Sequence, residues 1–490
     1  MKTARSFSAT AAATTAATAK RAPVLLPLVL SLFLGGCMSL APLYERPAAP
    51  VPAGFPLAAP ATPAADAGGS AATVEWQRFF GDPRLRQLIA LALQNNRDLR
   101  VAVFNIEQAR AQYQIRQADQ LPTVNAGLAG NRQPGTGGGT TTTYTGGLTV
   151  TAYELDFFGR IRNLSEAALA QYLATEEARR NVQISLIASV ANSYLSLLAD
   201  DELLALTKQT LAAREESLRL TKLKFDNGVV SELDFRQAES LVEGARATLA
   251  QQQRQRAVNE NALLLLVGQP LPSTLVAGAT LATTVIGSEL QAGLPSDLLT
   301  NRPDIRQAEQ LLIAANANIG AARAAFFPRI SLTGSAGSAS RELSGLFQGG
   351  TFVWTLAPQL LLPIFDAGRN QAGLEVAQAA RNVAIAQYER SIQNAFREVS
   401  DALAGRATYG EQLRAQRAQA DAEARRFKLS DLRYQSGAAS YLDLLDAQRS
   451  LFAAQQAAVQ TTLAQLQNQV TLYRVLGGGW SDAPALAEKQ

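Results

Sequence analysis

Residues 223–237 read LKFDNGVVSELDFRQ, and residues 432–446 read LRYQSGAASYLDLLD. A glycine that follows a helical pattern suits the left-handed position at a helix end, and a serine with an acid three residues later begins a new helix. Both stretches carry this signature, so each predicts a tight hairpin of two helices. The residues that carry it are Gly228, Ser231 and Asp234 in the first stretch and Gly437, Ser440 and Asp443 in the second.

These two stretches belong to a repeat that covers most of the chain. Residues 209 positions apart agree from the Gly-Arg pair at 159–160 to the Leu-Val-Gly triplet at 266–268, and residues 206 apart agree upstream. A period this long indicates a duplicated unit and not a solenoid. We therefore divide the chain into a signal peptide (1–36), a lipidated tether (37–75), a first structural repeat (76–268), a connecting insert (269–292), a second structural repeat (293–477) and a C-terminal tail (478–490).

Each repeat has the same order of periodic segments. A helix (97–120; 303–326) is followed by two strand-like runs (123–131 and 144–157; 329–338 and 351–363), a helix of about 65 residues (160–225; 369–434) and one of about 35 residues (232–266; 441–475). The longest helix spans roughly 100 Å, and the two shorter ones end to end span roughly 90 Å. We expect the long helix to run beside the shorter pair stacked end to end.

The four strand-like runs alternate apolar and polar residues. In TFVWTLAPQL (351–360), Phe, Trp and Leu side chains fall on one face, and Thr and Gln fall on the other. This period is typical of strands that face lipid on one side and water on the other. Four strands cannot close a barrel, and lipid does not tolerate an open sheet edge, so membrane strands would require an oligomer. Two soluble β-hairpins at the end of a helical rod are the alternative, whereas a free-standing coiled coil would leave the strands unexplained.

Composition excludes several classes of function. The chain has 490 residues and no histidine, which removes Ser-His-Asp and Cys-His nucleophile systems and histidine metal sites. It has one cysteine, so neither an intramolecular disulfide nor a Cys-x-x-Cys metal site can form. The net charge is +4, with no basic block interleaved with aromatics, so nucleic-acid binding is not indicated. We expect no enzyme, no metal site and no cofactor.

The single cysteine, Cys37, follows a secretory signal. Basic residues precede the apolar run VLLPLVLSLFLGG at 24–36, which is too short for a comfortable membrane-spanning helix. Residues 34–37, LGGC, resemble a bacterial lipobox, in which the cysteine becomes the acylated first residue of the mature chain. The resemblance implies N-palmitoyl and S-diacylglycerol groups on Cys37, and Met38 in place of an aspartate favours sorting to the outer membrane. The alternative is an ordinary signal peptide with a chance cysteine.

Five phrases extend the resemblance to a family. YELDFFGRIR (153–162), NRPDIRQAE (301–309), LPIFDAGR (362–369), LDLLDAQRSLFAAQQ (442–456) and the segment around Trp76 occur in the order found in TolC-like outer membrane efflux proteins, within the OprM/NodT-type lipoprotein branch. The resemblance implies a mainly α protein with membrane β-structure. Three chains would each give four strands to a 12-stranded β-barrel, continued by a long periplasmic α-helical barrel.

The same resemblance implies function and partners. The chain would be the outer membrane channel of a tripartite efflux system in a Gram-negative bacterium, lipid-anchored, with a large periplasmic portion. A periplasmic adaptor (membrane fusion) protein and an inner-membrane pump of the resistance-nodulation-division (RND) type would be its partners, and drugs and other small molecules its cargo. A protein-secretion channel is the runner-up, a non-conducting periplasmic scaffold is the third alternative, and an enzyme is the weakest.

The family also implies a gate at the hairpin tips. The second hairpin ends in Asp446 where the first has Gln237, and the capping box does not need that aspartate. Asp443 and Asp446 lie on one helix face, so threefold symmetry would make closely spaced acidic rings. Asp234 and Tyr434 match a TolC pair that links neighbouring helices in the closed state. Ala439 stands where TolC has an arginine partner in that closed-state link, so the resemblance favours the OprM-like version of the gate. The residues that match family gate positions are Leu442, Asp443, Asp446 and Arg449, with Tyr434, Ser440 and Asp234 in the tip network.

Overall fold

The computed structural model describes residues 39–56, 74–134, 138–272, 280–284, 286–287, 290, 293 and 295–480. The predicted signal peptide, Cys37 and most of the predicted C-terminal tail therefore lie outside the described residues. The chain folds into two compact units. The sheet unit contains Pro122–Arg160 and Ala324–Ile364, and the helical unit contains Ala41–Leu121, Ile161–Arg323 and the chain from Phe365 onward.

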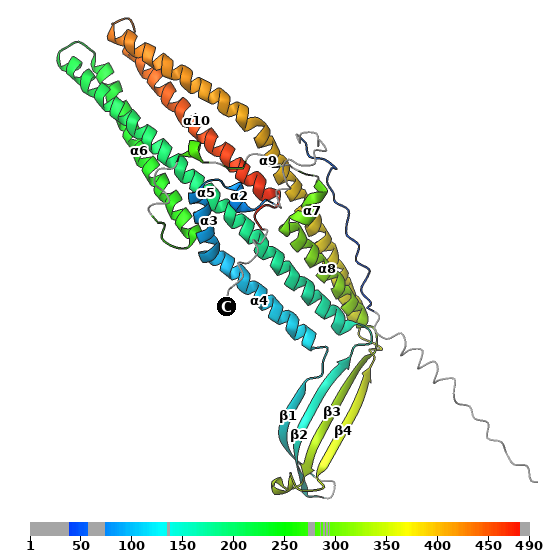
Figure 1. Ribbon diagram of the computed structural model, residues 1–490. Coiled ribbons are helices and arrows are strands. Elements are labelled where there is room, and N and C mark those ends of the chain that lie inside the picture. Colours follow the sequence, from blue (N-terminus) through cyan, green and yellow to red (C-terminus); the bar gives the residue numbers. More distant parts are fainter. Residues whose placement is uncertain are drawn as a thin grey trace, which may run out of the picture. The chain divides into compact units, whose positions relative to one another are not determined.

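The sheet unit is one antiparallel sheet with the strand order β1-β2-β3-β4 (Figure 1). Its strands are β1 (Val124–Pro134), β2 (Thr140–Leu155), β3 (Arg329–Ser340) and β4 (Phe352–Leu361). The four predicted strands are confirmed, but β1 and β2 extend further toward their connection than the sequence suggested. The reason is the threonine run at 140–143, whose β-branched side chains favour extended backbone and whose register pairs Thr140 with Pro134.

The sheet has two unpaired edges, because β1 and β4 each have one neighbour in the described chain. Large apolar side chains project from β4, with Phe352 and Trp354 exposed by 69% and 67%. An open edge and an apolar face of this kind are unstable in a single copy, both in water and in lipid. The sheet therefore has the form of a segment of a larger barrel.

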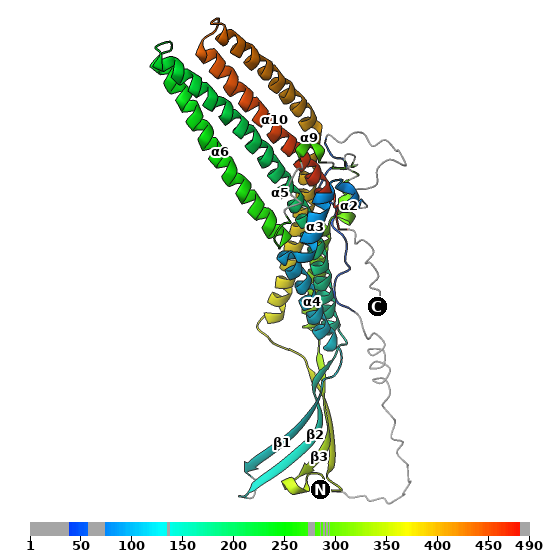
Figure 2. The ribbon, with the colours of Figure 1, turned by 60° about the vertical axis from the view of Figure 1, so that its left-hand side comes forward.

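The helical unit has the repeat order that the sequence predicts. In the first repeat, α4 (Arg97–Ala118), α5 (Arg160–Asp226) and α6 (Glu232–Val267) correspond to α8 (Pro303–Ala324), α9 (Arg369–Gln435) and α10 (Tyr441–Val475) in the second. The two long helices have 67 residues each, so the duplication keeps their length. Near the hairpin turns, α6, α5, α10 and α9 form a row in that order in both views (Figures 1 and 2).

Several short helices were missed by the sequence analysis. These are α2 (Trp76–Phe79), α3 (Pro83–Asn95) and α7 (Leu298–Asn301), together with the 3-10 turns η3 (Leu281–Thr283), η4 (Pro295–Asp297) and η5 (Leu343–Gly345). The signal for α3 was present, because Asp82 caps the helix by accepting from the Arg84 backbone N–H at 2.8 Å and Pro83 occupies the first turn. The predicted repeat helix therefore has a second helix immediately before it.

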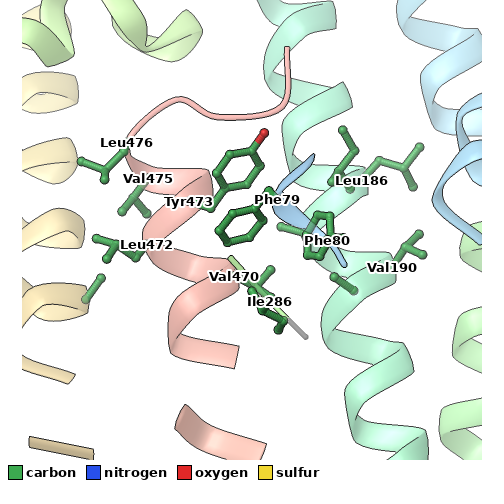
Figure 3. Close-up of a cluster of buried hydrophobic side chains, with 14 of the residues drawn as sticks. Phe79, Phe80, Leu186, Val190, Ile286, Val470, Leu472, Tyr473, Val475 and Leu476 are labelled. Carbon is green, nitrogen blue, oxygen red and sulfur yellow. The ribbon is translucent and has the colours of Figure 1, made fainter. Parts of the chain in front are cut away.

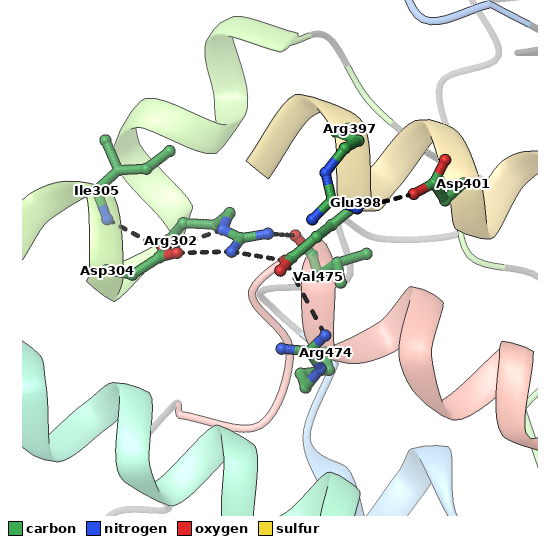
Figure 4. Close-up of polar contacts among 8 residues, drawn as sticks. All are labelled: Arg302, Asp304, Ile305, Arg397, Glu398, Asp401, Arg474 and Val475. Carbon is green, nitrogen blue, oxygen red and sulfur yellow. Dashed lines mark hydrogen bonds and ion pairs between the residues drawn. The ribbon is translucent and has the colours of Figure 1, made fainter. Parts of the chain in front are cut away.

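The shorter helices meet end to end, as predicted. In the first repeat the Asn96 amide caps α4 by accepting from the Leu99 N–H at 2.9 Å, and it donates to the Leu266 carbonyl at the end of α6 at 2.9 Å. In the second repeat the matching junction uses Arg302, which donates to the Val475 carbonyl at 3.0 Å (Figure 4). Each junction thus satisfies a carbonyl that the last turn of a helix leaves without a partner.

The junction in the second repeat carries buried charge. Arg302 has a side chain only 8% exposed, and it pairs with Asp304 at 2.6 Å and with Glu398 of α9 at 3.0 Å (Figure 4). Burial disfavours the guanidinium charge, but the two carboxylates outweigh that cost and raise the pKa of Arg302 above its ordinary value. One side chain therefore ties α8, α9 and α10 together.

An aromatic cluster lies in the core of the helical unit (Figure 3). Phe79 stacks on Tyr473 with ring centroids 4.0 Å apart, and Phe80 meets Phe79 edge-on at 4.9 Å. The Tyr473 hydroxyl donates to the Val74 carbonyl at 2.5 Å, so its polar end is satisfied. The cluster joins the start of the first repeat to the last turn of α10.

One window of α5 is apolar and long enough to cross a membrane by length and composition. Most of that window, 61%, is buried within the protein. Packing within the helical unit therefore accounts for its hydrophobicity.

Two glycines hold the ends of the repeats in a conformation that other residues rarely adopt. Gly268 and Gly477 have φ of +75° and +86°, and an added Cβ would lie 2.6 Å from the carbonyl oxygens of Asn95 and Asn301, respectively. We expect Gly477→Ala to lower the free energy of unfolding by about 2 kcal/mol, because it adds backbone strain and a backbone clash. Denaturant unfolding at fixed protein concentration measures the loss.

Gly373→Ala is the matched control, since Gly373 lies inside α9 with open space around its Cα. The control should gain roughly 0.5–1 kcal/mol from the higher helix propensity of alanine. Equal stability of the two variants would show that Gly477 is not constrained.

Candidate functional site

Each hairpin turn is closed by its glycine. Gly228 (φ +72°) donates to the Phe225 carbonyl at 2.8 Å, and the next residue, Val229, donates to the Lys224 carbonyl at 2.8 Å. Gly437 (φ +75°) and Ala438 make the same two bonds to Tyr434 and Arg433 in the second hairpin. This pattern is the Schellman ending of a helix, which is the geometry that the sequence predicts for both glycines.

Serine capping boxes start the return helices. The Ser231 hydroxyl accepts from the Asp234 N–H at 3.2 Å, and the Asp234 carboxylate accepts from Ser231. Ser440 and Asp443 repeat the arrangement on α10, with the Ser440 hydroxyl donating to Asp443 Oδ2 at 2.8 Å. Hydrogen bonds from the side chain and backbone of Ser440 lower the pKa of the Asp443 carboxyl below its ordinary value. Asp443 therefore stays ionised at neutral pH.

The first two turns of α10 separate an apolar side from a charged one. Tyr441, Leu444 and Leu445 are buried in a small cluster with Ala238 and Leu241 of α6. Three of the four residues matched to family gate positions, Leu442, Asp446 and Arg449, are exposed, and their spacing of four and three residues puts them on one helix face. The fourth, Asp443, is also exposed but is bound in the capping box. The structure thus brings Leu442, Asp446 and Arg449 onto one accessible stripe.

Asp446 has a partner that the sequence analysis missed. The Arg426 guanidinium of α9 donates to Asp446 Oδ2, and its other nitrogen reaches Glu423 at 3.2 Å and the Ser450 hydroxyl at 3.4 Å. The hydrogen bond to Asp446 is the largest cause of a raised pKa at Arg426. Arg426 lies nine residues before the end of α9, and Asp446 lies five residues after the start of α10, so no equal spacing about the turn marks this pair in the sequence.

Tyr434 and Asp234, which the family pairs, make separate contacts. The Tyr434 hydroxyl accepts from Lys224 at 3.3 Å, with the lysine nitrogen 4.7 Å from the ring centroid. Asp234 is occupied by Ser231, and no hydrogen bond joins it to Tyr434 in the described part of the chain. The link between the two hairpins at this level is thus made by Lys224, which the sequence analysis did not name.

Arg449 has a second arginine nearby. Arg214 of α5 is buried between the hairpins, donates to the Leu241 carbonyl at 3.2 Å and lies 5.6 Å from the Phe452 ring centroid. Burial lowers the pKa of Arg214, and repulsion from Arg449 lowers it further. The tip therefore contains charges that attract across one hairpin, Arg426 and Asp446, and charges that repel between the hairpins.

The tip combines hydrogen-bonded helix caps with exposed charged contacts. Asp443, Asp446 and Arg426 are exposed, whereas Arg214 is buried, and no three metal-ligating side chains converge among the residues that the structure describes. Charged contacts between exposed helices are individually weak, so they are suited to breaking and reforming. The gate roles of Leu442, Asp443, Asp446, Arg449, Tyr434, Ser440 and Asp234 stay predictions.

Comparison with known proteins supplies independent findings. A family model described as "Outer membrane efflux protein" matches residues 88–269 and 294–478, one match in each repeat. The toluene efflux pump outer membrane protein TtgC of Pseudomonas putida is 48% identical over 474 residues, covering 95% of this chain and 98% of TtgC. The antibiotic efflux pump outer membrane protein ArpC, also of Pseudomonas putida, has the same identity and coverage.

A solved structure is similar along its whole length. The outer membrane channel MtrE of Neisseria gonorrhoeae, crystallised in its open state, superimposes with a TM-score of 0.82 at 42% identity. The alignment covers 90% of this chain and 99% of MtrE. The likeness therefore includes both the sheet unit and the helical unit.

Proposed function

Because this chain belongs to the outer membrane efflux protein family, we propose that it is the outer membrane channel of a tripartite efflux system. Its work is conduction: it provides a water-filled duct and a gate, and a pump elsewhere supplies the energy. The observation that carries the proposal is a four-stranded sheet with two open edges and a lipid-compatible face, on a chain whose helices form two long hairpins.

The duct follows from closing these parts in three copies. Three sheets supply twelve strands, which removes every open edge and presents the apolar β4 side chains to lipid. Three rows of four helices supply a twelve-helix barrel. The six hairpin turns then gather at one end of the helical barrel, where the exposed stripe of Leu442, Asp446 and Arg449 recurs three times around the axis.

The cargo is small and partly apolar. TtgC and ArpC are described as toluene and antibiotic efflux proteins, and close likeness along the whole chain supports the same class of substrates here. A periplasmic adaptor protein and an inner-membrane RND pump are the proposed partners. Protein secretion is the second candidate, because the same architecture would also pass an unfolded chain.

An export assay tests the proposal. The chain is expressed with a cognate adaptor and pump in a host that lacks its own channel, and intracellular accumulation of toluene and of a fluorescent antibiotic is measured. We expect accumulation to fall only when all three components are present. Unchanged accumulation of both compounds, together with export of a protein substrate, would assign the chain to a secretion system instead.

Lipidation of Cys37 is a separate proposal with its own test. The lipobox resemblance at 34–37 supports it, and stable membrane anchoring by acyl chains needs more than one chain, which a triacylated cysteine provides. We expect Cys37→Ser to abolish incorporation of radiolabelled palmitate completely. The matched control is a serine substitution outside the lipobox, Thr73→Ser, which should label normally. Persistent labelling of the Cys37→Ser protein would refute the assignment.

A further inference from the structure

The four long helix segments near the turns leave two flanks uncovered. In the row α6-α5-α10-α9, α5 and α10 are inner helices, while α6 and α9 are the outer ones in both views (Figures 1 and 2). A groove of about 920 Å³ runs along α9 to the turn, and its lining includes Arg426, Arg433 and Asp443. If copies of this row close into a ring, the α9 flank of one copy must meet the α6 flank of the next.

The inner joint of the row shows what holds two hairpins together. The Ser217 hydroxyl of α5 lies 3.1 Å from the Tyr441 hydroxyl of α10, and Lys224 of α5 donates to Tyr434 of α9. Further along, the Gln467 amide of α10 donates to the Ser196 hydroxyl of α5 at 3.0 Å. The joint thus pairs the second helix of one hairpin with the first helix of the other.

Because the two hairpins are repeats of each other, the contacts between α5 and α10 predict the contacts between α9 and α6 of the next copy. The two hairpins have nearly equal helix lengths, the same capping boxes and the same turn bonds. The first hairpin is α5 with α6, and the second is α9 with α10. The movement that superimposes the first hairpin on the second places α5 on α9. In a closed ring the same movement places α10 on α6 of the next copy. The contact between Ser217 and Tyr441 then becomes a contact between their repeat mates, Arg426 and Glu232 of the partner subunit.

The mates are chemically matched. Arg426 and Glu232 of the partner subunit have opposite charges, and their side chains in the single chain are 45% and 65% exposed. The contact of Lys224 with the Tyr434 ring becomes a contact of Arg433 with the ring of the partner subunit's Phe225, which is a cation–π pair. Phe225 stacks on Phe235 with centroids 5.5 Å apart, so its ring is already held in place.

We propose that α9 of each chain docks against α6 of a second copy, with Arg426 bound to Glu232 of the partner subunit and Arg433 over the partner's Phe225. The inference rests on the trimer of the proposed function and adds the residues that close it at the tip. Arg426 then has two carboxylates within its own hairpin, Asp446 and Glu423, and one on the neighbour. The same side chain therefore couples the gate stripe of one subunit to the position of the next.

One pair of repeat mates has like charges and would weaken the contact between the two copies. Arg214 lies near the Phe452 ring across the inner joint, and their mates are Glu423 and Glu243 of the partner subunit, two carboxylates. Each already has an arginine on its own chain, Arg426 at 3.2 Å and Arg246 at 2.7 Å. The outer joint is therefore attractive at the turns and repulsive a few helical turns away, which makes it easier to open than the inner joint.

A charge-exchange experiment on the full chain tests the contact. The variants are Arg426→Glu, Glu232→Arg and the double variant Arg426→Glu/Glu232→Arg, and the readout is the temperature at which the purified trimer dissociates. Each single change should lower that temperature, and the double change should restore most of the loss. Residues 426 and 232 lie on opposite flanks of one chain, so restoration requires two copies.

Two controls separate the possible failures. The double variant Arg426→Glu/Glu260→Arg keeps the exchanged charges but displaces one by 28 residues, about 42 Å along α6, and should not restore stability. A short bifunctional maleimide should also join Arg426→Cys/Glu232→Cys subunits, and neither single cysteine variant alone. A stable trimer with neither restoration nor cross-linking would overturn the inference alone. A protein that never forms a trimer would overturn the proposed function as well.

Discussion

Asp446→Ala should raise the basal conductance of the reconstituted channel on the order of tenfold, because three equivalent contacts are lost together in a symmetric trimer. The aspartate accepts from Arg426 across the hairpin and has no role in the capping box, which Ser440 and Asp443 complete without it. Its removal therefore frees the gate stripe but leaves the turn folded. Single-channel recording at matched protein levels measures the change.

Asp431→Ala is the control for that variant. Asp431 is a carboxylate of α9 near the same turn, but it accepts from Gln435 of its own helix at 2.8 Å and makes no polar contact with a gate residue in the described part of the chain. Its conductance should equal that of the unaltered protein. If Asp446→Ala also conducts like the unaltered protein, Asp446 has no gating role. The stripe of Leu442, Asp446 and Arg449 is then an ordinary solvent-exposed helix face.

Arg302→Leu should lower the free energy of unfolding by about 3 kcal/mol, the largest loss expected from any single change described above. The substitution leaves Asp304 and Glu398 without their buried cation and the Val475 carbonyl without its donor. The estimate is at the low end for a broken buried pair, because both carboxylates are partly exposed. Denaturant unfolding at one fixed protein concentration gives the value.

Arg397, which precedes Glu398 in α9, provides an exposed arginine for comparison with Arg302 (Figure 4). It is also an arginine paired with a carboxylate, Asp401 at 3.4 Å, but both side chains are about two-thirds exposed. Arg397→Leu should change the stability by less than about 0.5 kcal/mol. Similar losses for the two variants would mean that burial at the Arg302 junction contributes nothing.

The sequence predicted the long elements because their signals are local. Gly228 and Gly437 mark turns, and Ser231 and Ser440 mark helix starts. Because the two repeats have the same order of elements, each prediction was supported by its counterpart in the other repeat. The strand ends were less accurate, since pairing across the sheet, such as Thr140 with Pro134, decides where β1 and β2 stop. Helix α3 was not predicted, although Asp82 and Pro83 form a typical helix start.

The site was predictable in its positions but not in its contacts. The resemblance identified Asp446 and Arg449, whose exposure on one face follows from helical spacing alone. Their partners Arg426 and Arg214 lie on other helices, and which helix faces which depends on packing that a linear pattern does not contain. Asn96 and Arg302 occupy the same place in the two repeats, yet one is neutral and the other charged, so the repeat predicts the junction but not its chemistry.

Conductance of the purified protein in a planar lipid bilayer tests the central claim most directly. The unaltered chain and the Asp446→Ala variant are inserted as trimers, and current is recorded under an applied voltage. A water-filled duct predicts discrete conductance steps, small for the unaltered chain and larger for the variant. Trimers that insert in the bilayer but carry no current above the lipid background in either form would contradict it and identify a scaffold instead of a channel.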